Sequence, residues 1–160
     1  NLFLSKLPVL AAGDSPLPRI GQSEPRNVAW IDLELPGGIV RLYGTHLSLV
    51  ARERVEQLRT LGELLAASPH PSIVLGDFNS PPLRLKSEAP FLWNPPWHDA
   101  HLAAGEGEGL TFPAQAPASR IDYVFVHSEL LPRLSRSAVY PSDASDHLPV
   151  MVELTLSPGS

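Results

Sequence analysis

The fold is decided by the stretch Ser72-Ile73-Val74-Leu75-Gly76-Asp77-Phe78-Asn79. Its first half is aliphatic and β-branched and lies between Pro71 and Gly76, a pattern typical of a short strand buried on both faces. Asp77 and Asn79 follow at the carboxyl end of this strand, and side chains two residues apart in extended chain share a face. This end of the strands is where α/β sheets bind ligands. A plain turn is the alternative interpretation, because Gly, Asp and Asn are also common in turns.

The segments before this strand predict an α/β fold. Residues 28–35 alternate between apolar and polar side chains, residues 36–38 form a Pro-Gly-Gly turn, and residues 39–46 return as the second strand of a hairpin. Residues 51–67 form the clearest helix, whose apolar side chains recur every three or four positions: Val55, Leu58, Leu61 and Leu65. The order strand, helix, strand from residue 39 to residue 75 predicts a crossover unit with the helix packed on the sheet.

The remaining segments are less regular. Strands are expected at residues 121–126, 137–140 and 150–156, and residues 2–10 are a further candidate that Pro8 interrupts. Residues 80–119 are rich in Pro, Trp, Gly and Ala and show no sustained period, so we expect a long loop with a short helical turn near residue 99. The charged side chains of the helix are expected largely outside its apolar stripe: Arg52, Glu53, Glu56, Arg59 and Glu63.

Composition limits what the chain can be. Its 160 residues suffice for one domain, and 43% hydrophobic with 18% charged residues is ordinary for a soluble globular protein. No stretch approaches the roughly 20 continuous apolar residues of a membrane-spanning helix. The absence of cysteine excludes disulfides and thiolate metal sites but leaves the compartment open, cytoplasmic or exported.

The charge balance bears on the substrate. A net charge of −5, with 12 basic residues and no run of them, argues against a long electrostatic footprint on nucleic acid. A phosphate-bearing substrate would have to be met locally, by a few arginines or histidines or by a bound divalent cation. An excess of acid is what a cation site would help to produce.

Six polar residues fall at strand ends in four separate places: His46, Asp77, Asn79, Asp122, Asp146 and His147. If the strands lie side by side, these ends converge on one pocket that contains three carboxylates, one amide and two imidazoles. Hard oxygen ligands hold Mg²⁺ or Mn²⁺, a histidine oriented by a carboxylate works near neutral pH, and an amide stabilises charge on phosphate oxygens. The set therefore suits phosphoryl chemistry.

Taken singly, these residues also have ordinary explanations. His46 could be a hydrogen-bonded histidine at a strand end. Asp122 could pair with Arg120 across a turn, and Asp146 could cap a local turn.

Four ordered motifs carry a resemblance to a known family. They are Gly44-Thr45-His46-Leu47, Gly76-Asp77-Phe78-Asn79, Arg120-Ile121-Asp122-Tyr123-Val124 and Ser145-Asp146-His147. In this order and at these intervals they resemble the second half of the endonuclease/exonuclease/phosphatase superfamily. That group includes deoxyribonucleases, abasic-site endonucleases, sphingomyelinases, inositol polyphosphate phosphatases and many bacterial hydrolases. The resemblance implies an α/β fold built as a four-layer α/β/β/α sandwich, and it covers nearly the whole chain.

The resemblance also implies catalytic roles. His147 matches the active-site histidine at the scissile phosphate, and Asp122 matches the carboxylate that orients it. Asp77 matches the residue that positions or deprotonates the attacking water, and Asn79 the amide donor to the phosphoryl oxygens. His46 resembles a second histidine that hydrogen-bonds the phosphate in some branches.

Metal binding and substrate follow from the same resemblance. Asp146 looks like a metal ligand, and with Asp77 and Asn79 it forms the expected site for Mg²⁺ or Mn²⁺. The implied activity is metal-dependent phosphoester hydrolysis, most simply cleavage of a phosphodiester by activated water. The substrate class stays open between nucleic acid, a lipid headgroup and a small phosphodiester. A non-catalytic binding or scaffold domain that retains the fold is the alternative.

The chain departs from the family in one respect. Members normally have an amino-terminal half that supplies an Asn and a metal-binding Glu, so we expect residues 1–160 to form a single partial domain lacking that half. One sheet should then be incomplete, the isolated fragment weak or inactive, and the full-length parent active. Exposed sheet edges also predict self-association.

Overall fold

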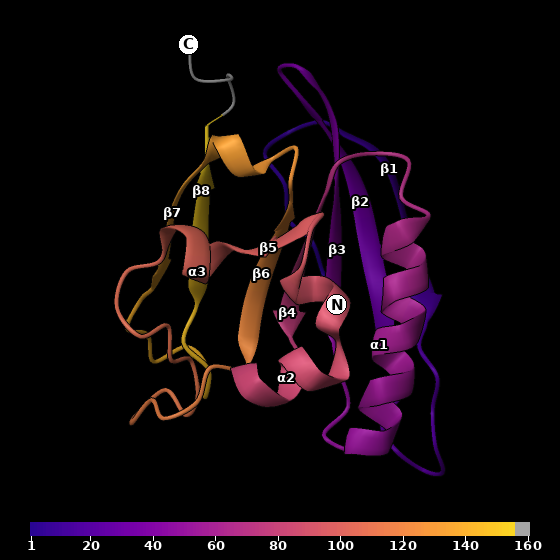
Figure 1. The fold of residues 1–160 in the computed structure, drawn as a ribbon, viewed down its shortest axis with the longest axis vertical. Helices are drawn as coiled ribbons and strands as arrows, with labels where there is room; N and C mark the ends of the chain where they lie inside the picture. The colour runs from indigo at the N-terminus through magenta and orange to yellow at the C-terminus, as the bar shows by residue number, and fades with distance from the viewer. Residues whose placement is uncertain (156–160) are drawn as a thin grey trace.

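The computed structural model describes residues 1–155. Six strands form one sheet in the order β1-β2-β3-β4-β6-β5. They are β1 (Val9–Pro16), β2 (Asn27–Leu35), β3 (Gly38–His46), β4 (Ser72–Asp77), β5 (Trp97–Asp99) and β6 (Asp122–His127). A second sheet pairs β7 (Leu134–Val139) with β8 (Val150–Leu154) (Figure 1).

The helices are α1 (Ala51–Ala66), α2 (Pro82–Glu88) and α3 (Ala100–Ala104), with 3-10 turns at Pro90–Trp93 and Leu131–Arg133. Strands β3 and β4 are parallel and joined through α1, which is the predicted crossover unit. None of the helices in residues 1–155 is both long and apolar enough to cross a membrane.

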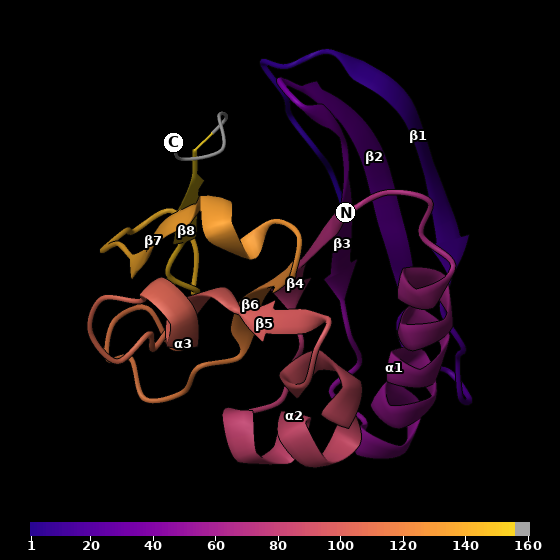
Figure 2. The same ribbon diagram turned by 45° about the horizontal axis from the view of Figure 1, so that its top comes forward.

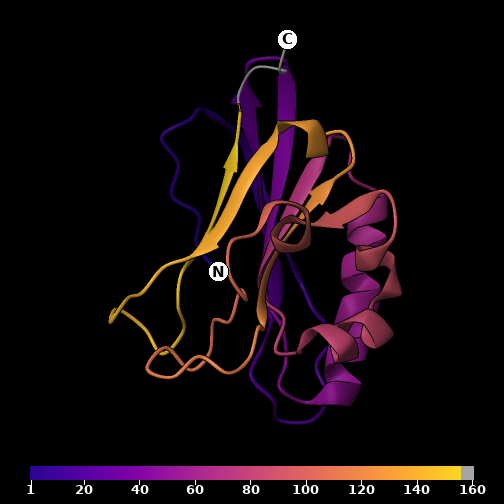
Figure 3. The same cartoon turned by 60° about the vertical axis from the view of Figure 1, so that its left-hand side comes forward.

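The molecule is layered around the six-stranded sheet. Figures 2 and 3 show α1 and α2 on one side of this sheet and the β7-β8 pair on the other. Alternation along the strands divides the apolar side chains between two cores. On β4, Val74 joins the core under the helices, whereas Ile73 and Leu75 lie in the core between the two sheets. The predicted α/β class and its stacking of helices on two sheets are confirmed.

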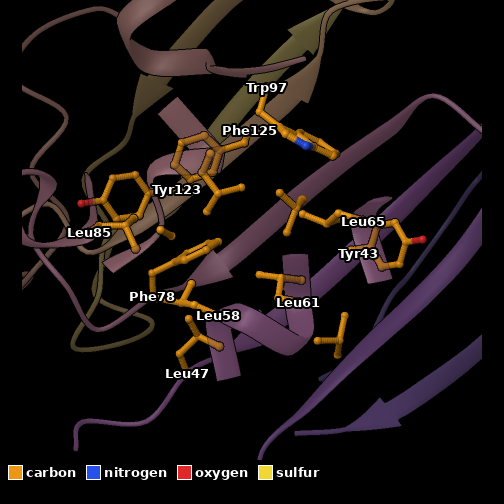
Figure 4. Packing of buried hydrophobic residues seen from close by; sticks show 14 of the residues in the cluster. Tyr43, Leu47, Leu58, Leu61, Leu65, Phe78, Leu85, Trp97, Tyr123 and Phe125 are labelled. Carbon is orange, nitrogen blue, oxygen red and sulfur yellow. The ribbon is translucent and has the colours of Figure 1, made fainter. Parts of the chain in front are cut away.

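The core under the helices fixes the strand that carries the site. Figure 4 shows Leu58 of α1 beside Phe78, which follows β4, and Phe125 of β6 belongs to the same core. Phe78 is fully buried, and its ring meets that of Phe125 edge-on at 5.7 Å between centroids. Because Phe78 stands between Asp77 and Asn79, its burial anchors the backbone that presents both polar side chains.

Several predicted boundaries were wrong. The first strand covers Val9–Pro16 rather than residues 2–10, so residues assigned to a loop pair with β2 instead. The expected long loop at residues 80–119 contains α2, β5 and α3. These elements are too short to show a period, and they are held by tertiary contacts. Strand β7 begins three residues earlier than expected, and Leu156 of the expected last strand lies outside the described residues.

Helix α1 buries a wider face than its apolar spacing predicts. Leu58, Leu61 and Leu65 are buried as expected. Val55 is 42% exposed, whereas Glu53, Arg54 and Gln57 are buried. Glu53 accepts hydrogen bonds from Ser23 Oγ at 2.6 Å and from the Ile20 backbone N–H at 2.9 Å. The Ser23 bond is the main reason that the pKa of Glu53 is lowered. A loop packed over α1 makes this polar face an interior one, which the helix sequence alone does not reveal.

The open edge of the main sheet is β1, where Val9 is 48% and Leu10 is 51% exposed. Unpaired edge strands with apolar side chains favour strand pairing between molecules. Self-association through this edge stays a prediction.

A buried ion pair on β2 and β3 predicts an acid-dependent loss of stability. Arg41 donates to both carboxylate oxygens of Asp32, at 2.6 and 2.7 Å, and this hydrogen bonding lowers the pKa of Asp32 against the opposing effect of burial. We expect Asp32→Asn to lower the free energy of unfolding at pH 7 by about 1.5 to 3 kcal/mol, the range for hydrogen bonds to charged groups.

The pH dependence has a definite sign. Because the pKa of Asp32 is lowered in the folded state, its charge stabilises the fold above the unfolded pKa of about 3.9. This stabilisation is lost as the pH falls from that value through the lower folded pKa. The difference in the free energy of unfolding between wild type and Asp32→Asn, measured in urea, should therefore become smaller below about pH 4. Asp143→Asn, at an exposed carboxylate, is the control. An equal gap at pH 7 and pH 3.5 would contradict this origin.

Candidate functional site

The six predicted site residues line one cavity of about 520 Å³: His46, Asp77, Asn79, Asp122, Asp146 and His147. The rest of its lining consists of Arg26, Leu49, Phe112, Ile121 and Ser145. The predicted convergence of strand ends is therefore present in the structure. Convergence alone does not say which side chain reacts, so the individual roles stay predictions.

Sheet register places the carboxylates opposite each other. In the parallel pair β3-β4, His46 is the partner of Asp77, and in the antiparallel pair β4-β6, Asp77 is the partner of Asp122. His46 Nε2 lies 3.2 Å from Asp77 Oδ2. The carboxyl ends of β3 and β4 and the amino end of β6 thus meet at one edge of the sheet.

The segment after β4 is a strand end and a turn at once. Asp77 Oδ1 accepts a hydrogen bond from the Asn79 backbone N–H at 2.8 Å, and Asn79 has a φ of 48°. Such a side chain to backbone bond two residues on is an Asx turn, and Asn tolerates this left-handed conformation. The Asn79 amide donates to the Leu47 carbonyl at 2.8 Å, which fixes its orientation. The segment is therefore both the end of a buried strand and a turn, which were alternatives on the sequence alone.

Gly76 has a structural role at this strand end. Its φ is +140°, and a Cβ added there would lie 1.9 Å from the Thr45 carbonyl oxygen. We expect Gly76→Ala to lower the free energy of unfolding by about 3 kcal/mol or more, from backbone strain combined with the clash.

The matched control for Gly76 is Gly21, whose φ is +68° but which has no atom within 4 Å of an added Cβ. Gly21→Ala should cost only the left-handed backbone penalty of about 1 to 2 kcal/mol. Urea unfolding of both variants measures the difference. Equal losses would contradict the clash.

Asp122 and His147 form a hydrogen-bonded pair. His147 Nδ1 lies 2.8 Å from Asp122 Oδ2, which also accepts from Thr111 Oγ1 at 2.6 Å. Asp122 does not pair with Arg120, because the Arg120 guanidinium binds Asp99 instead, with Nη2 2.6 Å from Oδ2. Since Nδ1 is engaged, only Nε2 of His147 remains for a ligand in the cavity.

The loop that carries His147 is held by the segment at Thr111. Leu148 N–H donates to the Thr111 carbonyl at 2.8 Å, and Ala114 N–H donates to the Asp146 carbonyl at 2.8 Å. The Phe112 ring lies 4.8 Å from the His147 ring between centroids. These contacts place a surface loop against β6, and they give Thr111 and Phe112 a supporting role that sequence reasoning missed.

The electrostatics of the site differ from residue to residue. Burial raises the pKa of Asp77, and the nearby Asp122 charge adds to the rise. Burial lowers the pKa of His46 despite the opposing Asp77 charge. For His147, burial acts to lower the pKa, but the hydrogen bond and charge of Asp122 outweigh it and the pKa is raised. The two histidines therefore differ, and His147 is the one that holds its proton more strongly.

Three residues offer closely spaced metal ligands. Ligand atoms of Asp77, Asp122 and His147 lie within 4.8 Å of one another. Of the two aspartates in the predicted metal site, only Asp77 belongs to this set. Asp146 is exposed, and its Oδ1 lies 3.2 Å from Ser145 Oγ. Carboxylate oxygens suit Mg²⁺ or Mn²⁺. His147 is already hydrogen-bonded to Asp122, so the carboxylate and amide oxygens of the cavity suit Mg²⁺ or Mn²⁺ better than the imidazole does.

Arg26 is a further residue of the cavity to which the sequence assigned no role. It precedes β2 and lines the cavity beside His46, where its charge contributes to the lowered pKa of that histidine. The only signal in the sequence was its position just before the strand that pairs with the His46 strand. An isolated arginine in a loop carries no pattern that would distinguish it.

Comparisons with known proteins identify the family of the chain. The sequence profile of the Endonuclease/Exonuclease/phosphatase family matches residues 1–147. None of the curated proteins compared with the sequence matches it significantly.

Among solved structures, the mannosyl-6-phosphatase Bt3783 of Bacteroides thetaiotaomicron is similar, with a TM-score of 0.78 and 23% identity over 94% of this chain and 67% of that one. A functionally unknown conserved protein of Enterococcus faecalis has a TM-score of 0.78 at 19% identity, covering 95% and 68%. D. rerio TDP2 with a single-strand DNA product has a TM-score of 0.72 at 18% identity, covering 92% and 68%. At these identities the structures show a common fold, and the profile match over most of the chain shows that the protein belongs to the Endonuclease/Exonuclease/phosphatase family.

Proposed function

We propose that the protein is a divalent-metal-dependent phosphoester hydrolase that cleaves a phosphodiester. Family membership supports phosphoester hydrolysis in general. The observation that carries the more specific proposal is the meeting of Asp77, Asp122 and His147 in one cavity, with ligand atoms within 4.8 Å of one another.

The His147-Asp122 pair is proposed to act at the scissile phosphate. Asp122 holds Nδ1 of His147 at 2.8 Å, so the imidazole presents Nε2 to the substrate. The raised pKa of His147 favours its protonated form near neutral pH. A protonated Nε2 can donate a proton to the departing oxygen and stabilise negative charge on the phosphate. Thr111 holds Asp122 in the orientation that this requires.

Asp77 is proposed to orient the attacking water. Its raised pKa makes it a stronger base than an exposed aspartate, and the Asn79 N–H fixes one of its oxygens. The Asn79 amide retains one N–H that the Leu47 carbonyl does not use, and we assign this donor to a phosphoryl oxygen. His46, whose Nε2 lies 3.2 Å from Asp77 Oδ2, is proposed to contact the same phosphate.

Mg²⁺ or Mn²⁺ would be held by oxygen atoms of Asp77, Asn79 and Asp146, all of which line the cavity. When bound, the ion supplies Lewis-acid stabilisation of charge at the phosphate. The proposed set of Asp77, Asn79 and Asp146 offers few protein oxygens to an ion that favours six ligands. We therefore infer weak Mg²⁺ binding and slow turnover by residues 1–160 alone.

Metal removal tests the proposed function. We expect bis-p-nitrophenyl phosphate to be hydrolysed with Mn²⁺ or Mg²⁺, to stop reacting when EDTA is in excess, and to recover when the metal is restored. Asp77→Ala should reduce both the rate and Mn²⁺ binding measured by titration calorimetry. Rates that change neither with EDTA nor with Asp77→Ala would contradict the hydrolase proposal and favour a non-catalytic domain.

A further inference from the structure

Arg26 lies in the candidate site but takes no part in the chemistry described so far. Its side chain is only 11% exposed, and one of its nitrogens, Nη2, lies 2.9 Å from Glu24 Oε2. Its Nε is buried and has no hydrogen-bond partner among the described residues. The arginine therefore lines the cavity while one of its donors stays unpaired, which is unusual because buried polar atoms are almost always paired.

The charges around Arg26 indicate what that donor is for. Three carboxylates line the cavity, and Arg26 is the only Lys or Arg in its described lining. A phosphate entering such a cavity meets like charge on most sides. The guanidinium is permanently charged, and its planar set of N–H donors matches phosphate oxygens. The cavity thus has one fixed cation that does not depend on pH or on a metal.

Glu24 is a poor explanation for the burial of Arg26. The Glu24 side chain is 72% exposed, so its attraction for the guanidinium is weakened by water and salt. It engages Nη2 and leaves Nε–H without a partner. If Arg26 served only as the counter-ion of Glu24, burying its Nε–H without a partner would cost free energy and strengthen no interaction.

We propose that Arg26 is a substrate-binding residue whose guanidinium donates to a non-bridging oxygen of the phosphate bound between His46 and His147. This inference rests on the proposed function and extends it, because it assigns the phosphate a metal-independent anchor. Glu24 holds the far side of the guanidinium and so orients the donor. The shared ligand chemistry is a phosphate group, in either a monoester or a diester.

Binding of inorganic phosphate tests the proposal without reference to turnover. In metal-free buffer, titration calorimetry should show Arg26→Ala binding phosphate at least about 10-fold more weakly than wild type, as for the loss of a charge-assisted hydrogen bond. Arg26→Lys should recover only part of this loss, because lysine restores the charge but not the planar donor. Arg52→Ala, which removes an exposed arginine of α1 outside the cavity, is the charge-matched control and should bind as wild type does.

Glu24→Gln separates a binding role from a structural one. If Arg26 acts only as the partner of Glu24, this variant would lose phosphate binding as fully as Arg26→Ala does, and the proposal would be overturned. We expect Glu24→Gln to retain most of the binding. Circular dichroism and the unfolding temperature of each variant confirm that the comparison concerns folded protein.

Kinetics with two substrates distinguish the sources of the phosphate. Arg26→Ala should raise KM more than it lowers kcat, for p-nitrophenyl phosphate if the ligand is a monoester and for bis-p-nitrophenyl phosphate if it is a diester. If the wild type hydrolyses the substrate and Arg26→Ala has the same KM and phosphate affinity, the inference is overturned and the proposed function is left intact. If no substrate is hydrolysed but phosphate binding still depends on Arg26, the proposed function would be overturned and the inference about Arg26 would stand.

Discussion

Replacing His147 with alanine is expected to lower kcat for bis-p-nitrophenyl phosphate by about 10²- to 10⁴-fold, the contribution typical of a positioned acid or base. The expectation rests on geometry. His147 lines the cavity, its Nδ1 is held by Asp122 at 2.8 Å, and the same carboxylate is held by Thr111. Steady-state kinetics with saturating Mn²⁺ measures the effect.

Asp122→Asn should give a smaller but clear loss of kcat, because the amide no longer fixes the orientation of the imidazole or stabilises its charge. His98→Ala is the matched control, since this histidine lies on β5, outside the cavity, with its Nε2 3.0 Å from Ser128 Oγ. Rates of His147→Ala within two-fold of those of His98→Ala would remove His147 from the mechanism.

Glu88→Ala is expected to lower the free energy of unfolding by about 3 to 5 kcal/mol, because it leaves a buried charge without its partner. Arg54 of α1 is 1% exposed and donates to both Glu88 oxygens, with Nη2 at 2.7 Å from Oε1 and Nε at 2.9 Å from Oε2. Ser80 Oγ donates to Glu88 as well, at 2.8 Å. Urea unfolding at pH 7 measures the loss.

The Arg54-Glu88 pair also supports the site. Arg54 Nη1 donates to the carbonyls of Ser48 and Leu49, which follow His46, while Ser80 follows Asn79. The ion pair therefore joins the loops after β3 and β4. We expect Glu88→Ala to weaken phosphate binding in addition to stability, because both loops lose a common anchor.

An exposed pair on the same helix provides the control for Glu88. Arg59 Nη1 lies 2.6 Å from Glu63 Oε1, but both side chains are more than 60% exposed, at 62% and 64%. Glu63→Ala should cost no more than about 0.5 kcal/mol. Replacing both buried partners, Arg54→Met with Glu88→Leu, should recover part of the Glu88→Ala loss, since no charge is then left buried. Equal losses in Glu88→Ala and Glu63→Ala would show that burial does not govern the pair.

Much of the fold could be predicted from the sequence because its signals are local. Alternation at residues 28–46, a helical period at residues 51–67 and the apolar run before Gly76 each specify an element independently of distant contacts. The placement of polar residues at strand ends followed from these elements. Their convergence was expected only if the strands lie side by side. The crossover rule accounts for the parallel pair β3-β4 alone, because Asp122 comes from the amino end of the antiparallel β6.

Other features depend on partners far along the chain and escaped prediction. Glu53 is buried because Ser23 and the Ile20 N–H, some thirty residues earlier, fold over α1 and hydrogen-bond it. Strand β1 lies at Val9–Pro16 because that register pairs with β2. In neither case does the residue's own neighbourhood in the sequence hold the information.

The sequence by itself determined the family motifs, the hairpin and crossover unit of residues 28–75 and which polar side chains stand at strand ends. Only the tertiary structure decided that Asp122 binds His147 rather than Arg120, and that Arg26 lines the same cavity. The physical reason is range. Strand and helix patterns arise from neighbours along the chain, whereas the partner of a charged side chain is chosen among all groups that folding brings within hydrogen-bond distance.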